Sequence, residues 1–182
     1  MKGIIDSTLR EGEQAAHVYF DLTEKLHIIN LLIKVDIDEI ELGIAVQNPE
    51  TRELIKKAGK LAGCPKLALW CRCLPGDIEE TLALSPDVIA LSIPVSDIHI
   101  EHKLGRDRTW VMTRARESIL LTNGTGNNPR QVLSKKIDIL ELDGLIEEAV
   151  EAVFEGHSMN YMIRRDVDAC NRKCSGVGMG CM

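Results

Sequence analysis

The segment Val88-Ile-Ala-Leu-Ser-Ile93 decides the fold, because every position in it except Ser92 is apolar. A strand with one face in water alternates apolar and polar residues, whereas a strand buried on both faces reads as a continuous apolar run. Strands of the second kind belong to parallel sheets that are covered by helices. The segment therefore predicts a parallel α/β protein, in which strands and helices alternate along the chain.

The sequence on both sides of this segment has that alternation. Three more apolar runs of strand length precede it, at residues 3–5, 39–42 and 66–71. Each of the four runs is followed by apolar residues at helical spacing, over residues 22–35, from Asn48-Pro49 to before Gly63, over 77–84 and over 108–121. Pro49 suits a first helical position, and Thr23 is placed to cap the first helix. Four strand–helix units in a row predict half of a barrel or a small doubly wound sheet.

The pattern breaks at Asn123-Gly-Thr-Gly-Asn-Asn-Pro129, a cluster typical of a loop or junction. We therefore expect a partial barrel domain over residues 1–121 and an extension of unassigned fold over 122–182. Within the extension, residues 137–142 suit one strand and residues 145–154 one short helix. The tail from His157 is rich in Gly and Cys and has no clear period, so its removal is expected to leave the barrel half soluble.

The cysteines allow two interpretations. Cys170, Cys174 and Cys181 lie among glycines and, with His157, offer soft ligands for a metal or an iron–sulfur cluster; the alternative is ordinary reduced thiols in a tail. Cys71 and Cys73, at the end of the third strand, are expected to point to opposite faces and to serve in packing.

Composition excludes several classes of protein. The 182 residues carry a net charge of −6 with a pI near 5.4, which argues against binding nucleic acid or an anionic membrane. No apolar run reaches the about 20 residues of a membrane span, and Met1-Lys2 opens directly into a strand without an export signal. A cytoplasmic protein with reduced thiols is therefore expected.

The polar segment Asp6-Ser-Thr-Leu-Arg-Glu-Gly-Glu-Gln14 directly follows the first strand. Active sites of parallel α/β proteins form at the carboxyl ends of the strands, so Arg10, Glu11 and Gln14 stand where a site would be. Arg10 offers a planar fork for a carboxylate or a developing enolate, and Glu11 offers hard oxygen for a divalent metal. The alternative is a solvated turn without function.

Three blocks of sequence resemble the homocitrate synthase and isopropylmalate synthase family. The segment from Asp6 to Gln14 is similar to its strand-one signature, and Glu39-Ile-Glu-Leu-Gly43 to its strand-two motif. The third block closely resembles the nitrogen-fixation type of homocitrate synthase and consists of Leu69-Trp-Cys-Arg72, Leu91-Ser-Ile-Pro-Val-Ser-Asp97 and His102-Lys-Leu-Gly-Arg-Asp-Arg-Thr-Trp110. The resemblance covers residues 1–117, about two thirds of the chain.

The resemblance implies a TIM (β/α)8 barrel, of which this chain holds the first four βα units. It also implies that acetyl-CoA condenses with 2-oxoglutarate to homocitrate, with a divalent cation (Mg, Mn or Zn) as Lewis acid. The implied roles differ by position. Arg10 stabilises the keto acid and the developing charge, Glu11 is a metal ligand, and Gln14 lies in the substrate pocket. Glu41 supports the site from inside the barrel, Trp70 shapes the pocket, and Arg72 and Ser96 are substrate-binding residues at the top of the barrel.

The sequence departs from the family in several places. The family's other metal ligands, a His-x-His pair on the seventh strand, have no counterpart here, and His99 and His102 do not replace them. Ala90 stands where relatives commonly have Asp. Val35-Asp36 stands where they have Leu-Gly, and Asp is tolerated there because it visits the left-handed region.

Three hypotheses follow. Half a barrel exposes strand edges and apolar surface, so the first is a split or truncated synthase subunit, inactive alone, that binds a partner completing the barrel or forms a homo-oligomer. The second is a catalytically inactive homologue that acts as a binding or regulatory protein or is a remnant. The third is a fusion, in which the part after Asn123 belongs to another fold.

Overall fold

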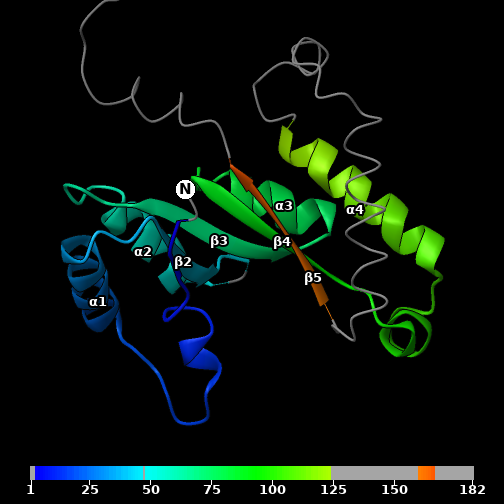
Figure 1. Cartoon of the computed structure of the whole chain (residues 1–182), viewed down its shortest axis with the longest axis horizontal. Helices are drawn as coiled ribbons and strands as arrows, with labels where there is room; N and C mark the ends of the chain where they lie inside the picture. The colour runs from blue at the N-terminus through cyan, green and yellow to red at the C-terminus, as the bar shows by residue number, and fades with distance from the viewer. Residues whose placement is uncertain (1–2, 47, 124–159, 167–182) are drawn as a thin grey trace, which may run out of the picture.

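The computed structural model describes residues 3–46, 48–123 and 160–166. They form one sheet with the order β1-β2-β3-β4-β5 (Figure 1). The first four strands are β1 (Ile5–Asp6), β2 (Glu39–Ile44), β3 (Lys66–Arg72) and β4 (Val88–Pro94), and neighbours among them pair in parallel. A helix follows each strand: α1 (Leu22–Lys34), α2 (Pro49–Ala58), α3 (Pro75–Leu82) and α4 (Arg108–Asn123). The four parallel βα units confirm the predicted half of a (β/α)8 barrel.

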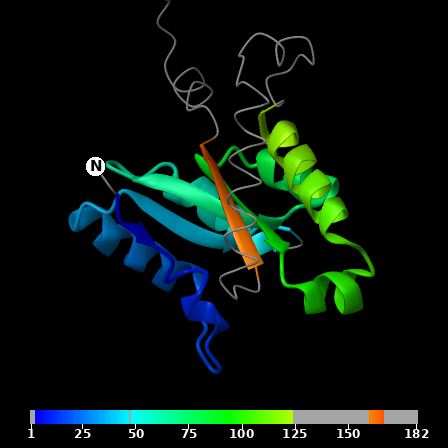
Figure 2. The same cartoon turned by 45° about the vertical axis from the view of Figure 1, so that its right-hand side comes forward.

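The four helices cover the convex face of the curved sheet (Figures 1 and 2). Side chains at alternate positions of β2, β3 and β4, such as Ile40, Leu69 and Leu91, are fully buried beneath them. The buried residues form two apolar clusters, one around α1 and α2 and one around α3 and α4. The other alternate positions of β2 and β3, which include Glu41, Trp70 and Arg72, face the concave side that a closed barrel would enclose.

Local signals set the helix starts. The Asn48 side chain accepts a hydrogen bond from the Thr51 amide at 3.1 Å, and Pro49 is the first residue of α2, as predicted. The cap of α1 was predicted wrongly. Asp21, and not Thr23, accepts from the Thr23 and Glu24 amides, and Glu24 accepts from the Asp21 amide in return. Such a capping box satisfies two amide donors at once, which a lone hydroxyl does not.

Asp36 takes the left-handed backbone conformation, with φ of +58°, in the turn between α1 and β2. The tolerance predicted for Asp at this position is therefore confirmed. The predicted opposite orientation of Cys71 and Cys73 is wrong, because both thiols are buried in the cluster beneath α3 and α4. Residues two apart in extended backbone share a face. Their predicted role in packing is confirmed.

The strand β5 (Asn160–Asp166) lies in the tail for which the sequence predicted no element. It pairs antiparallel with β4 along the whole strand, from Val88 opposite Asp166 to Pro94 opposite Asn160. A strand edge carries unpaired amides and carbonyls, and β5 satisfies those of β4. The predicted strand at 137–142, the predicted helix at 145–154, and the candidate ligands His157, Cys170, Cys174 and Cys181 lie outside the described residues.

No helix within the described ranges combines the length and the apolar character needed to cross a membrane.

Candidate active site

A tight turn after β1 brings Arg10 over the neighbouring strand. The Asp6 carboxylate accepts hydrogen bonds from the Thr8 amide and hydroxyl, both at 3.1 Å. The Ser7 carbonyl accepts from the amides of Arg10, at 3.0 Å, and Glu11, at 2.7 Å. Leu9, which is 1% exposed, anchors the turn in the core. The turn therefore fixes the backbone of Arg10 at the carboxyl end of the sheet.

Two carboxylates hold the Arg10 guanidinium. Its Nε donates to Oε2 of Glu41 at 2.8 Å, and its Nη1 lies 2.6 Å from Oε1 of Glu11. The side chains of Arg10 and Glu41 are 10% and 2% exposed, whereas that of Glu11 is 51% exposed. Glu41 thus holds the Arg10 cation from inside the half-barrel, whereas the carboxylate of Glu11 is open to solvent.

Trp70 and Gln14 complete the surroundings of Arg10. The guanidinium carbon lies 5.8 Å from the centre of the Trp70 ring, which is cation–π distance. The Gln14 amide, turned so that its oxygen faces Arg10, accepts from Nη1 at 3.2 Å and donates to Oε2 of Glu11 at 3.2 Å. The structure therefore brings together Arg10, Glu11, Gln14 and Glu41, four of the predicted site residues.

This arrangement can stabilise negative charge on a bound molecule. The contacts to Glu41 and Glu11 use Nε and Nη1, and they leave Nη2 outside these contacts. A guanidinium fixed by a buried carboxylate needs little rearrangement when charge develops beside it, which is the basis of electrostatic preorganisation. The group as a whole, one cation with two carboxylates, favours an additional cation near Glu11.

Arg72 and Ser96 make contacts elsewhere. The Arg72 guanidinium donates twice to the Asp77 carboxylate of α3, at 2.5 and 3.0 Å, and this hydrogen bonding raises the pKa of Arg72. Ser96, in the loop after β4, hydrogen-bonds to Nδ1 of His99 at 2.7 Å. His99 begins the π-helical turn η2 (His99–Leu104). A substrate-binding role of Arg72 would require its fork to leave Asp77.

The described residues do not form a complete metal site. Within them no group of three or more His, Cys, Asp or Glu side chains is placed to hold a metal ion. Glu11 is one hard oxygen ligand, and catalytic metals take about three protein ligands. The chemistry at Glu11 fits a divalent cation in kind but not in ligand number, so further ligands would have to come from outside the described part of the chain.

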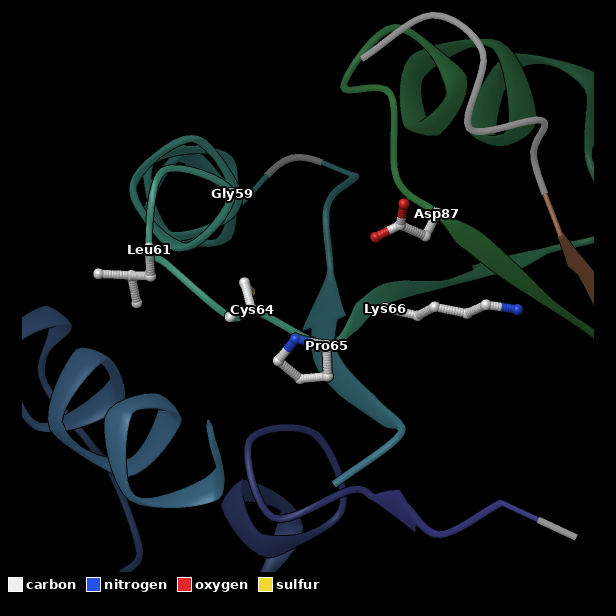
Figure 3. Close-up of a pocket in the computed structure, with 7 residues that line it drawn as sticks. Gly59, Leu61, Cys64, Pro65, Lys66 and Asp87 are labelled. Carbon is white, nitrogen blue, oxygen red and sulfur yellow. The ribbon is translucent and has the colours of Figure 1, made fainter. Parts of the chain in front are cut away.

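A pocket of about 330 Å³ lies at the other end of the sheet (Figure 3). It is lined by the turn after α2 (Gly59, Leu61, Gly63, Cys64, Pro65), the first residue of β3 (Lys66) and the residue before β4 (Asp87). In Figure 3 the Lys66 and Leu61 side chains point away from each other, without converging on a common point. The pocket lies at the amino end of the strands and the Arg10 site at the carboxyl end, so the two are separate. In barrels the amino end of the strands serves stability.

Sequence reasoning missed one ionic cluster beside the site. Lys25 is 3% exposed and lies between Glu13 and Glu50. A signal was present, because Lys25 stands three residues after Leu22 and four before Ile29, on the apolar stripe of its helix. A lysine on such a stripe is buried, and a buried lysine requires partners.

The sequence matches a family model and several known proteins. A family model described as HMGL-like matches residues 2–159. The chain is 38% identical over 123 residues to 2-isopropylmalate synthase 2 of Caldanaerobacter subterraneus subsp. tengcongensis, a match that covers 68% of this chain and 32% of that protein.

Several relatives carry the name homocitrate synthase. Homocitrate synthase subunit alpha of Clostridium pasteurianum is 29% identical over 147 residues, which are 76% of this chain and 55% of that protein. Homocitrate synthase of Frankia alni is 36% identical over 114 residues, which are 63% of this chain and 32% of that protein. The chain thus spans about a third to about half of the length of these curated relatives.

Proposed function

Because the chain belongs to the HMGL-like family, we propose that it contributes the Arg10 side of an active site that condenses acetyl-CoA with a 2-oxoacid. One observation carries the proposal. The guanidinium of Arg10 is fixed at the carboxyl end of the sheet by Glu41, beside Glu11 and Gln14. Relatives named as isopropylmalate, homocitrate and citramalate synthases support the class of reaction.

The proposed reaction has two steps. The methyl group of acetyl-CoA gives a proton to a general base, which the complementary half would supply, and the resulting carbanion attacks the keto carbon of the 2-oxoacid. The keto oxygen gains negative charge and then takes up a proton to become a hydroxyl group. Water then cleaves the thioester and releases CoA. Arg10 stabilises the charge on the keto oxygen, Glu41 holds Arg10 in place, and Gln14 contacts the substrates. These roles do not pass through a metal; a divalent metal remains an expectation of the resemblance, with Glu11 as one ligand.

We propose 2-oxoglutarate as the 2-oxoacid, and homocitrate as the product. The sequence block around Trp70 and the one from His102 to Trp110 support this choice, because they resemble homocitrate synthases of the nitrogen-fixation type. Relatives named homocitrate synthase match the chain.

We propose further that the chain acts as a subunit. The described residues form half of a barrel and hold one candidate metal ligand, and a partner that completes the barrel, or a second copy, would supply groups that these residues do not. The Clostridium pasteurianum relative is itself named as a subunit. The incomplete ligand set also favours the second hypothesis, a homologue that binds but does not catalyse.

The test is co-expression with the complementary half of a homocitrate synthase barrel, the half that holds its fifth to eighth strands, for example that of the Frankia alni relative. Release of free CoA is then measured with acetyl-CoA and 2-oxoglutarate, 2-oxoisovalerate or pyruvate. We expect turnover with 2-oxoglutarate and none with the chain alone. Turnover only with another 2-oxoacid would contradict the proposed substrate, and a stable complex inactive with every acid would favour the binding homologue.

A further inference from the structure

A buried lysine ties the loop that carries the candidate active site to two helices. Lys25 lies in the first turn of α1, and its side chain is 4% exposed. Its ammonium Nζ lies 2.6 Å from Oε1 of Glu50, on α2, and 3.0 Å from Oε1 of Glu13. Glu13 belongs to the short 3-10 helix η1 (Gly12–Gln14), directly before Gln14 and two residues after Glu11.

The same cluster holds the far end of the loop. Oε1 of Glu13 also accepts from the Phe20 amide at 3.1 Å. The Tyr19 ring centre lies 5.7 Å from the Lys25 ammonium, and the Tyr19 hydroxyl donates to Oε2 of Glu50 at 2.8 Å. One ammonium therefore links both ends of the loop between η1 and α1 to the first two helices.

The Lys25 ammonium offsets the negative charge of the two carboxylates that it joins. Burial lowers the pKa of Lys25, but its hydrogen bonds to Glu50 and Glu13 outweigh burial, and the pKa is raised overall. The hydrogen bond from Lys25 in turn lowers the pKa of Glu50. Lys25 and Glu50 are therefore both charged at neutral pH. Without the ammonium, two carboxylates would face each other and repel.

The loop, and not α2, would yield to that repulsion. Leu54 of α2 is fully buried, and Ile55 and Ala58 are buried beside it. The helix η1 has no buried residue and is held at Glu13 through this cluster. Displacement of Glu13 would move Glu11 and Gln14 with it, because neighbouring Cα atoms are fixed about 3.8 Å apart.

We propose that Lys25 is a positioning residue, which acts through Glu13 to hold the loop so that Glu11 and Gln14 stay against Arg10. Its importance for catalysis rests on the proposed function. Its effect on the loop does not, and can be measured in the isolated full chain.

The probe is Trp70, which lies against Arg10. The chain has two tryptophans, so Trp110→Phe leaves Trp70 as the single emitter. In that background we expect Lys25→Met to raise acrylamide quenching of Trp70 at least about twofold, because the contact with Arg10 loosens. Hydrogen exchange should rise over residues 7–21 and stay constant in β3. Lys25→Arg should restore both readouts, since a guanidinium also reaches two carboxylates.

Two further variants keep the test decisive. Lys57→Met removes an exposed lysine that pairs with Glu53 at 2.8 Å, and should change neither readout. Glu13→Gln removes the loop's carboxylate but keeps the Lys25–Glu50 pair, and should loosen the loop even if Lys25→Met fails to fold. Unchanged quenching and exchange in both Lys25→Met and Glu13→Gln would overturn the proposal.

Kinetics separate this inference from the proposed function. In the complemented enzyme, Lys25→Met should raise KM for the 2-oxoacid about tenfold, because a displaced loop misplaces the binding groups. Mere loss of folded protein would lower kcat and leave KM unchanged, and that result would also overturn the positioning role. If the complemented wild type shows no turnover, the proposed function fails, whereas the fluorescence and exchange still decide the role of Lys25.

Discussion

At the scale of single residues, Arg10 and its frame of carboxylates define the site. Glu41 is almost fully buried, and its carboxylate lies 2.8 Å from the Arg10 guanidinium, so that it forms the inner support of this cation. Glu11 is half exposed and serves a different purpose, because its carboxylate is open to further ligands. The division between a buried support and an exposed ligand predicts different consequences for substitution at each position.

Substitution of Arg10 tests the charge-stabilising role. In the complemented enzyme, Arg10→Ala should lower kcat by about 10²–10³, the usual effect of losing one preorganised donor to a developing oxyanion. Arg106→Ala, on an exposed arginine that stacks on Trp110, is the matched control and should leave the rate unchanged. The assay is CoA release, and a near-normal rate in the Arg10 variant would remove Arg10 from the mechanism.

Substitution of Glu41 tests the support. Glu41→Ala removes the buried carboxylate partner of Arg10 and leaves the half-exposed Glu11, and should lower the free energy of unfolding by about 3–5 kcal/mol. Glu53→Ala breaks an exposed pair on α2 and should cost less than about 1 kcal/mol. Urea unfolding followed by circular dichroism measures both. Equal losses of unfolding free energy in the two variants would mean that the Arg10–Glu41 pair stabilises the fold no more than an exposed pair does.

The buried thiols predict a loss of stability at alkaline pH. Burial raises the pKa of Cys71 to about 12 and that of Cys73 to about 11, above the ordinary value of 9.0. Between pH 9 and 11 the unfolded chain releases these protons and the folded chain keeps them, so the free energy of unfolding falls as pH rises. Each thiol contributes about 1.4 kcal/mol per pH unit.

The measurement is urea unfolding of the wild type and of the Cys71→Ala/Cys73→Ala variant from pH 7 to 11. The difference in slope between the two isolates the thiols from lysine and tyrosine titration. The variant should lose less stability with rising pH than the wild type. Parallel curves would show that the thiols ionise as readily in the folded protein as in the unfolded one.

At the scale of elements, local signals predicted the four parallel βα units, the family resemblance predicted that they form half of a barrel, and the pairing of distant segments was not predicted. The apolar run in β4 and the Asn48-Pro49 helix start act within a few residues, so the sequence shows them directly. The strand β5 forms because β4 leaves an edge unpaired, and its partner lies more than sixty residues earlier. The sequence predicted that Arg10 and Glu41 lie at the same end of the sheet. It did not predict the contact between their side chains, because that contact depends on the register of the strands.

The pairing of β5 with β4 leads us to predict that the part of the tail that holds β5 matters for solubility, the opposite of what the sequence suggested. Ile163→Pro, opposite Leu91, removes an amide and should weaken the β4–β5 ladder. Hydrogen exchange in β4 should then rise, and the chain should self-associate at micromolar concentration, because an open β4 edge pairs with other chains. Deletion of residues 175–182 keeps β5 and is the control. Sedimentation velocity that shows the Ile163→Pro variant unchanged would argue against edge protection by β5.

At the scale of the whole molecule, the two edges of the curved sheet differ. The β4 edge is covered by β5, whereas the β1 edge is a strand of two residues in which Ile5 is exposed, as is Ile4 before it. Leu31 and Val35, near the end of α1, are exposed as well. A polypeptide that completes the barrel would bury these exposed apolar side chains at the β1 edge. At the β4 edge it would have to replace β5.

The most direct measurement is a titration of the purified chain with the complementary barrel half, with CoA release from acetyl-CoA and 2-oxoglutarate as the readout. Release should rise from the uncatalysed background and reach a plateau at equimolar ratio, and the Arg10→Ala chain should form the complex without restoring release. Full release by the chain before any complementary half is added, or no release at a ratio where the two halves form a stable complex, would contradict the assignment of this chain as half of a condensing enzyme.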